Sequence, residues 1–468
     1  PYMGSKNMNA DLAEYLKTFY PRSKSDLFAV FIEMMLSKLQ DEGRLGCIIM
    51  ESWMFLRSYE NLRTHLLHNY SIQSLSHFGW HIIGIAFGTV ATILQNKPAK
   101  PSEFGVYSYL TINDIEKESG SPYVFPKRDN GRYTEMVQSD LSKIPGSPLA
   151  YWVTKAQLAL FNHPPLVDYS SFKEGLTTAN NDLFLRLWHE VEYPKITRNM
   201  SETSSGLIWV PYNKGGPYRK WYGNQIYIVD WRINGSKIKE YKGSSFRNSS
   251  YHFKRGSTFS ALSAGQFSAR YSGPGFAFDS KGTMFFSDNE LEGVTEFLNS
   301  NICSGLLELI APTLDFRFGT IQRLPYLKIP TSNFSDLVDI SKTDWDLFET
   351  SWDFSINPLV RERLEAITLM ESYLKHRSIS QRRSDQLREM EVQNNKTYIR
   401  HYKLDESFDY KVPLNEVSLL CNPHYRYSGD KSENDLELLF LADTVRDLTS
   451  YAIGCFMGRY RLDKPGLN

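Results

Sequence analysis

The sequence has little cysteine and no long apolar run. Its four cysteines are scattered, without a CxxC pair or metal-ligand spacing, which argues against a disulfide framework and predicts a reduced, cytoplasmic setting. No apolar run reaches the roughly 18 residues of a membrane span, and the amino terminus has no signal-peptide pattern. We therefore expect a soluble protein with no membrane partner.

The formal net charge is zero, because 53 lysines and arginines balance 53 aspartates and glutamates. A nucleic-acid partner would therefore need a local basic patch. Aromatic residues are plentiful, with 28 Tyr, 28 Phe and 9 Trp, which suits stacking surfaces as well as cores. Four histidines are close in sequence but have no carboxylate or cysteine partner at ligand spacing. We interpret them as surface histidines and predict no metal site: His65, His68, His77 and His81.

The first 110 residues alternate between helical and strand patterns. Helical spacing is clear from Leu27 to Leu39, and a second helix is expected through Leu62 and Leu66. Short apolar runs of strand type lie at 47–50, 71–78, 90–94 and 106–110. This alternation predicts an α/β layer with a largely parallel sheet.

The character of the chain changes beyond residue 125. Prolines punctuate the sequence there and long helical periodicity disappears, which predicts a domain boundary between residues 110 and 150. Helical spacing returns from residue 360 to 400 and from Asp435 to Met457. We therefore expect a first domain at 1–125, a β-rich α+β domain at 126–330 and a helical spacer at 331–468.

A basic stretch lies between Gly206 and Gly275, with eleven lysines and arginines against two acids, interleaved with aromatics. Basic side chains that neutralise phosphates supply most non-specific DNA affinity, and arginine can also read guanine edges. An ordinary β-rich domain with a basic surface would have the same composition. We assign DNA binding to nine residues of the basic stretch: Lys214, Arg219, Lys220, Trp221, Tyr222, Arg247, Lys254, Arg255 and Arg270.

Several motifs resemble a known family. Pro1-Tyr2-Met3-Gly4, the segment 43–53 and the segment 87–92 follow one another as in the later catalytic half of γ-type adenine methyltransferases. Residues 315–325 resemble the closing segment of target-recognition domains in restriction-modification specificity proteins. Further blocks resemble the PglX methyltransferases of bacterial BREX phage-defence systems, so that the resemblance spans nearly the whole chain: 175–191, 209–216, 218–224, 345–354, 389–399 and 451–460.

The resemblance implies a fold and a chemistry. The chain would contain the C-terminal half of a Rossmann-like S-adenosylmethionine-dependent methyltransferase domain, followed by a target-recognition domain and the helical spacer. Pro1 and Tyr2 would end the family's Asn-Pro-Pro-Tyr motif. Tyr2 would stack on a flipped adenine, with Phe87 packed against the opposite side of the base.

The complete enzyme would methylate the exocyclic amine of adenine at specific sites in double-stranded DNA. The family's glycine-rich loop that holds S-adenosylmethionine has no counterpart in these residues. The chain by itself is therefore expected to be inactive.

Two alternatives remain open. A single-chain restriction-modification enzyme would share this methylation core and add a nuclease domain, although no paired-carboxylate nuclease signature stands out here. A non-catalytic module would instead bind DNA or a phage inhibitor and keep a vestigial catalytic half. Other phage-defence proteins are possible partners under any of these interpretations.

Overall fold

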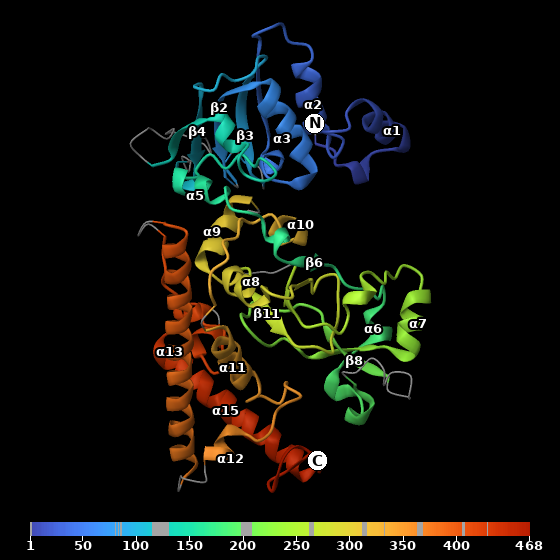
Figure 1. Ribbon diagram of the computed structural model, residues 1–468, viewed down its shortest axis with the longest axis vertical. Coiled ribbons are helices and arrows are strands. Elements are labelled where there is room, and N and C mark those ends of the chain that lie inside the picture. The colour runs from blue at the N-terminus through green and yellow to red at the C-terminus, as the bar shows by residue number, and fades with distance from the viewer. Residues whose placement is uncertain are drawn as a thin grey trace. The chain divides into compact units, whose positions relative to one another are not determined.

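The structure is a computed structural model that describes residues 2–79, 81–82, 84, 87–114, 131–197, 208–261, 266–310, 316–331, 333–362, 368–404, 408–427 and 429–468. The chain divides into two compact units, which are coloured by residue number in Figure 1. Unit 1 is Pro1–Asn162 with Leu306–Pro312, and unit 2 is His163–Gly305 with Thr313–Asn468. Residue 125 thus falls inside unit 1, and residue 330 falls inside unit 2.

Unit 1 is built on a five-stranded sheet of order β1-β3-β2-β4-β5. Its strands are β1 (Arg44–Met50), β2 (Ser71–Phe78), β3 (Thr89–Gln95), β4 (Phe104–Leu110) and β5 (Tyr133–Val137). Its helices are α1 (Ala10–Phe19), α2 (Leu27–Leu36), α3 (Glu60–Asn69), α4 (Gln138–Leu141) and α5 (Lys155–Leu160). The helices and strands expected from the sequence in this region are confirmed.

The expectation of a largely parallel sheet was wrong. Among the described strands of this sheet, only β2 and β4 pair in parallel, whereas β3 is antiparallel to both β1 and β2, and β5 to β4. Residues 79–88 join β2 to β3, and this link is shorter than the dozen or more residues that a parallel crossover needs. The two neighbouring strands therefore run in opposite directions.

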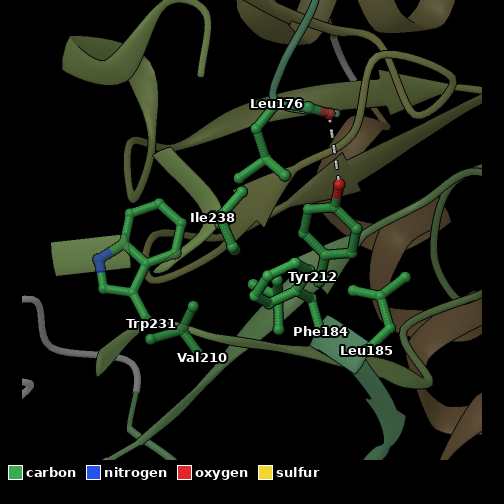
Figure 2. Packing of buried hydrophobic residues seen from close by; sticks show 9 residues of the cluster. Leu176, Phe184, Leu185, Val210, Tyr212, Trp231 and Ile238 are labelled. Carbon is green, nitrogen blue, oxygen red and sulfur yellow. Dashed lines mark hydrogen bonds between the residues drawn. The ribbon is translucent and has the colours of Figure 1, made fainter. Parts of the chain in front are cut away.

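Unit 2 contains two four-stranded sheets, of order β11-β10-β13-β6 and β12-β8-β9-β7. Their strands are β6 (Ser171–Lys173), β7 (Leu185–Leu187), β8 (Trp209–Asn213), β9 (Tyr227–Asp230), β10 (Gly256–Phe259), β11 (Ala269–Ser272), β12 (Ala277–Phe278) and β13 (Met284–Phe286). Alternate side chains of the second sheet enter a core that includes Val210 and Tyr212 (Figure 2). The Tyr212 hydroxyl donates to the Leu176 carbonyl and to Asp279 in this core.

The other elements of unit 2 are mainly helices, and the longest of them lie after residue 331. Its helices are α6 (Asn181–Phe184), α7 (Arg232–Glu240), α8 (Leu291–Leu298), α10 (Phe318–Ile321), α11 (Phe334–Trp345), α12 (Pro358–Glu362), α13 (Leu369–His401), α14 (Pro423–Arg426) and α15 (Glu433–Phe456), followed by the hairpin β14 (Tyr460–Arg461) and β15 (Lys464–Leu467). The division of the chain falls within α9 (Asn301–Ile310), whose residues from Leu306 on belong to unit 1. The long helix α13 begins with a capping box, because the Thr368 hydroxyl accepts from the Glu371 amide and the Glu371 carboxylate accepts from the Thr368 amide.

Candidate active site and nucleic-acid interface

Tyr2 and Phe87 lie together in unit 1. Their ring centroids are 5.7 Å apart and their planes meet at 72°, an edge-to-face arrangement. The buried ring of Phe28, on α2, lies 6.4 Å from Tyr2. Tyr2 itself is 52% exposed, so the pair presents an open aromatic ring to solvent. The structure thus brings together two of the three predicted catalytic residues, and Pro1 lies outside the described residues.

Backbone hydrogen bonds to the start of α2 fix the segment that carries Tyr2. The Met3 amide donates to the Asp26 carboxylate at 3.1 Å, and the Leu27 amide donates to the Met3 carbonyl at 3.2 Å. Asp26 is also the N-cap of α2 and accepts from the Phe28 amide at 3.3 Å. Since most of α2 is buried, the Tyr2 backbone is attached to a rigid element.

Phe87 lies two residues before β3, close to the point where this strand enters the sheet between β1 and β2. The Glu51 amide, just after β1, donates to the Gly88 carbonyl at 3.0 Å. The Glu51 carboxylate packs on Gly88, where a Cβ atom would lie 2.0 Å from its carboxyl carbon. Glu51 therefore occupies the space that a side chain at position 88 would need.

A histidine of β2 completes this support. His77 Nε2 lies 2.7 Å from a Glu51 carboxylate oxygen, and His77 Nδ1 lies 3.1 Å from the Tyr151 hydroxyl. Burial raises the pKa of Tyr151, so its hydroxyl stays protonated. The interpretation of His77 as a surface histidine was wrong, because the fold buries it and gives it a carboxylate from another strand end. We call Glu51, His77 and Tyr151 the Glu51 clamp, since they join the ends of β1 and β2 across the start of β3.

Five of the nine residues assigned to DNA are interior, which corrects their assignment to a binding surface. These are Arg219, Lys220, Trp221, Tyr222 and Arg270. The Lys220 ammonium lies 3.3 Å from the Glu391 carboxylate of α13, and the Trp221 indole donates to the same carboxylate at 2.6 Å. These charged and aromatic side chains thus belong to a buried network that joins the β-rich part of unit 2 to its helices.

The arginines of this network are deeply buried as well. The Arg219 guanidinium lies 3.6 Å from Asp344 of α11. Burial and the neighbouring Arg219 charge lower the pKa of Arg270 to about 10. Burial by itself lowers the pKa of Lys220, but Glu391, Tyr218 and Glu416 together outweigh this effect, so that the pKa lies above its ordinary value. These cations hold the fold together and are not available to phosphates.

The other four assigned residues do reach the surface. Arg247 pairs with Glu174 at 2.9 Å and Arg255 with Glu292 at 2.9 Å, and both arginines remain exposed. Lys254 is exposed, with its ammonium 5.0 Å from the Tyr251 ring centroid. Lys214 is half-buried, and this burial lowers its pKa. The exposed part of the basic stretch also includes Lys237, Lys239 and Lys242, which the DNA assignment left out.

Comparison with known proteins identifies the chain's relatives. The model of the Eco57I restriction-modification methylase family matches residues 1–82. Along the whole chain, the adenine-specific methyltransferase PglX of Lacticaseibacillus casei (strain Zhang) is 34% identical, and the adenine-specific methyltransferase BrxX of Escherichia coli O9:H4 (strain HS) is 33% identical. This chain is homologous to PglX and BrxX. The resemblance derived from the motifs is thereby confirmed.

The chain spans 39% of the length of this PglX and 38% of BrxX. Among solved structures, the type IIL restriction-modification enzyme MmeI in complex with DNA is 11% identical, with a TM-score of 0.45, over 96% of this chain and 56% of that chain. That score is too low to support a conclusion about the PglX homologue.

Sequence reasoning missed the residues that hold Tyr2 and Phe87 in place. Asp26, Glu51, His77 and Gly88 belong to separate elements, and only the fold shows that they meet. The one signal in the sequence was the position of two residues, since Glu51 directly follows a strand and Gly88 directly precedes one.

Within the described residues, no helix is both long and apolar enough to cross a membrane. The same residues contain no group of three His, Cys, Asp or Glu that could hold a metal ion.

Proposed function

We propose that this chain is the part of a site-specific DNA adenine N6-methyltransferase that holds the target base and contacts the duplex. The complete protein would act in a BREX-type phage-defence system, in keeping with the names of its relatives. The observation that carries the proposal is the Tyr2–Phe87 pair, an exposed aromatic ring with a second ring edge beside it. Such a pair suits a flat base that has been turned out of the helix.

The chain's own residues would act by stacking and orientation. The target adenine would lie on the open face of the Tyr2 ring. The hydrogen bonds of Asp26 to the Met3 and Phe28 amides hold the backbone next to Tyr2 in place. Phe87 would limit how far the base slides, because the Glu51 clamp fixes the start of β3. Holding the amine in one orientation lowers the entropic part of the barrier, and no covalent bond to the protein is needed.

We propose S-adenosylmethionine as the methyl donor of the complete protein, where it would supply the methyl group. The carboxylates beside the aromatic pair do not suit the donor's binding, since Asp26 is bound to two amides and Glu51 to His77. The described part of unit 1 thus offers a surface for the target base and not for the donor. The 468 residues alone are expected not to transfer methyl groups.

We assign unit 1 to the C-terminal half of a Rossmann-like catalytic domain, and unit 2 to target recognition together with its helical support. The half-buried Lys214 and the exposed Arg247, Lys254 and Arg255 remain as candidate contacts to double-stranded DNA. Burial supports this choice of residues, because these four cations reach the surface, whereas Arg219, Lys220 and Arg270 of the same stretch are interior.

The test is to map N6-methyladenine in cells that lack other adenine methylation, with and without the complete gene. We expect one asymmetric or palindromic motif to become methylated only when the gene is present. Absence of methylation from expressed, soluble protein would contradict the proposal. Cleavage of unmethylated DNA by the purified complete protein would instead favour the restriction-modification alternative.

A further inference from the structure

The segment that follows β9 in unit 2 has a strained backbone. Ile233, Asn234 and Gly235 have φ values of 49°, 53° and 73°, all in the left-handed region, before α7 continues as a right-handed turn. Glycine and asparagine adopt this region at little cost, but a β-branched isoleucine does so rarely. Strain of this kind persists only where the surrounding structure imposes it.

Core residues on both sides impose this conformation. Trp231 and Ile238 are buried in the cluster of Figure 2, where both side chains point into the same core. The Gly235 amide donates to the Trp231 carbonyl at 3.1 Å, and a Cβ at Gly235 would lie 2.9 Å from the Phe246 ring. The three left-handed residues therefore form a short, rigid loop between two anchors.

The loop holds an apolar side chain out in water. Ile233 is 79% exposed, although the core cluster lies only a few residues away on either side. Asparagine at this position would relieve the strain and hydrate better. Exposed apolar side chains are common on protein surfaces, but this one is also held in a backbone conformation that disfavours isoleucine, and the two features together point to a contact outside the described fold.

Positive charge accompanies this side chain. Lys237 and Lys239 of α7 and the following Lys242 are all exposed, against one acid in the same segment, Glu240. In the described part of the chain, no ion pair joins these three lysines to a carboxylate. The nearby Arg232, in contrast, is held by Asp230.

We propose that Ile233 is a wedge residue that enters duplex DNA at a base step, while Lys237, Lys239 and Lys242 bind the phosphates beside it. The proposal rests on the proposed function and extends it to a specific contact. Apolar side chains that enter a base step bend the duplex and are accompanied by cations that bind its backbone. A single apolar side chain among cations fits this partner better than a protein, since protein interfaces have larger cores depleted of charge.

The test uses the complete protein and a duplex that carries the motif methylated in cells. 2-Aminopurine is placed at successive positions outside the target adenine, so that its fluorescence reports unstacking at the wedge and not base flipping. Ile233→Asn should abolish this signal and weaken binding by about tenfold to a hundredfold, because the buried apolar contact is lost. Its melting temperature should stay unchanged or rise, because asparagine tolerates the left-handed backbone.

Ile233→Leu separates the wedge from the backbone, since it keeps an apolar side chain and removes the β-branch. It should retain both the signal and the affinity. Leu374→Asn, at an exposed leucine of α13, is the matched control and should bind like the wild type. Wild-type affinity and signal in Ile233→Asn would overturn the proposal, as would equal losses in the Asn and Leu variants. A wild-type protein that neither binds nor methylates the duplex would contradict the proposed function itself.

Discussion

At Gly88 the chain has no space for a side chain, and this single position connects the sheet to the candidate active site. The Glu51 carboxylate lies where a Cβ would be, and the Glu51 amide donates to the Gly88 carbonyl. Any side chain at position 88 must displace Glu51 and, with it, the bond to His77. Because Phe87 is the preceding residue, such a displacement would also move its ring.

Gly88→Ala should therefore lower both stability and methylation. We expect a loss of about 1–3 kcal/mol in the free energy of unfolding from the overpacked site, together with a lower rate of methyl transfer in the complete protein. Gly46→Ala is the matched control, because Gly46 lies in the neighbouring strand β1 and a Cβ there would meet nothing within 4 Å. Thermal unfolding and methyl transfer of the two variants measure both effects. Equal behaviour of the two alanine variants would show that Glu51 does not constrain Phe87.

Glu296, on α8, is a buried residue whose protonation should make the free energy of unfolding of unit 2 depend on pH. Burial raises its pKa from 4.5 to about 7. Because the folded state holds this proton more tightly than the unfolded state, its contribution to stability is present below about pH 4.5 and is lost as pH rises to about 7. Glu296→Gln removes this charge.

We predict that Glu296→Gln is more stable than the wild type above pH 7 by about 2–3 kcal/mol, and that the difference vanishes near pH 4.5. Chemical denaturation at several pH values measures it. Glu389→Gln, at an exposed glutamate of α13, should leave the pH dependence of the wild type unchanged. A Glu296→Gln variant with the wild-type pH profile would contradict the raised pKa.

At the scale of elements, buried ions join strands to helices in unit 2. Glu391 of α13 accepts from the Trp221 indole and pairs with Lys220, and both partners are buried. A buried ion pair adds little over an apolar pair of similar volume, but removing one partner leaves the other charge unpaired in the interior. The network should therefore be sensitive to single changes and more tolerant of double ones.

Glu391→Leu should cost about 3–5 kcal/mol of unfolding free energy, because it leaves the Lys220 ammonium buried and unpaired. Adding Lys220→Met should restore part of this loss, although the Trp221 indole still lacks its acceptor. A double-mutant cycle by chemical denaturation gives the coupling energy. A coupling near zero would mean that the two side chains do not interact in the folded protein.

The elements of unit 1 could be predicted from the sequence because each depends on local periodicity. The buried helix α2 and the strands β1 to β4 appear where their apolar patterns predict them. Strand direction could not be derived in the same way, because it depends on which strands become neighbours and on the length of their links. The alternation of helices and strands suggested parallel strands, but it does not take the length of each link into account. Residues 79–88 are too few for a parallel crossover between β2 and β3.

The candidate site was predictable only in part. The motifs placed Tyr2 and Phe87 in one site, and their rings do meet. Charge density in the basic stretch did not separate buried cations from exposed ones, because the partner Glu391 lies 170 residues from Trp221 in sequence. Local composition gives no sign of a partner at such a distance.

At the scale of the whole molecule, the proposed function assigns a different role to each of the two units. Unit 1 carries the aromatic pair, and unit 2 carries the exposed basic side chains and the Ile233 loop. Homology to PglX and BrxX runs through both units, although the chain spans only 39% and 38% of their lengths. The central claim is that Tyr2 and Phe87 together hold the target adenine.

Methyl transfer to a duplex with the recognised motif, measured with the purified complete protein, tests this claim most directly. Tyr2→Ala should slow transfer by about tenfold to a hundredfold, because base stacking on an aromatic ring contributes about 1–3 kcal/mol. Tyr2→Phe should retain most of the rate, and Tyr15→Ala should match the wild type, since Tyr15 is an equally exposed tyrosine of α1 at 51%. If Tyr2→Ala transferred methyl groups as fast as Tyr15→Ala, Tyr2 would not hold the base and the account of this site would be wrong.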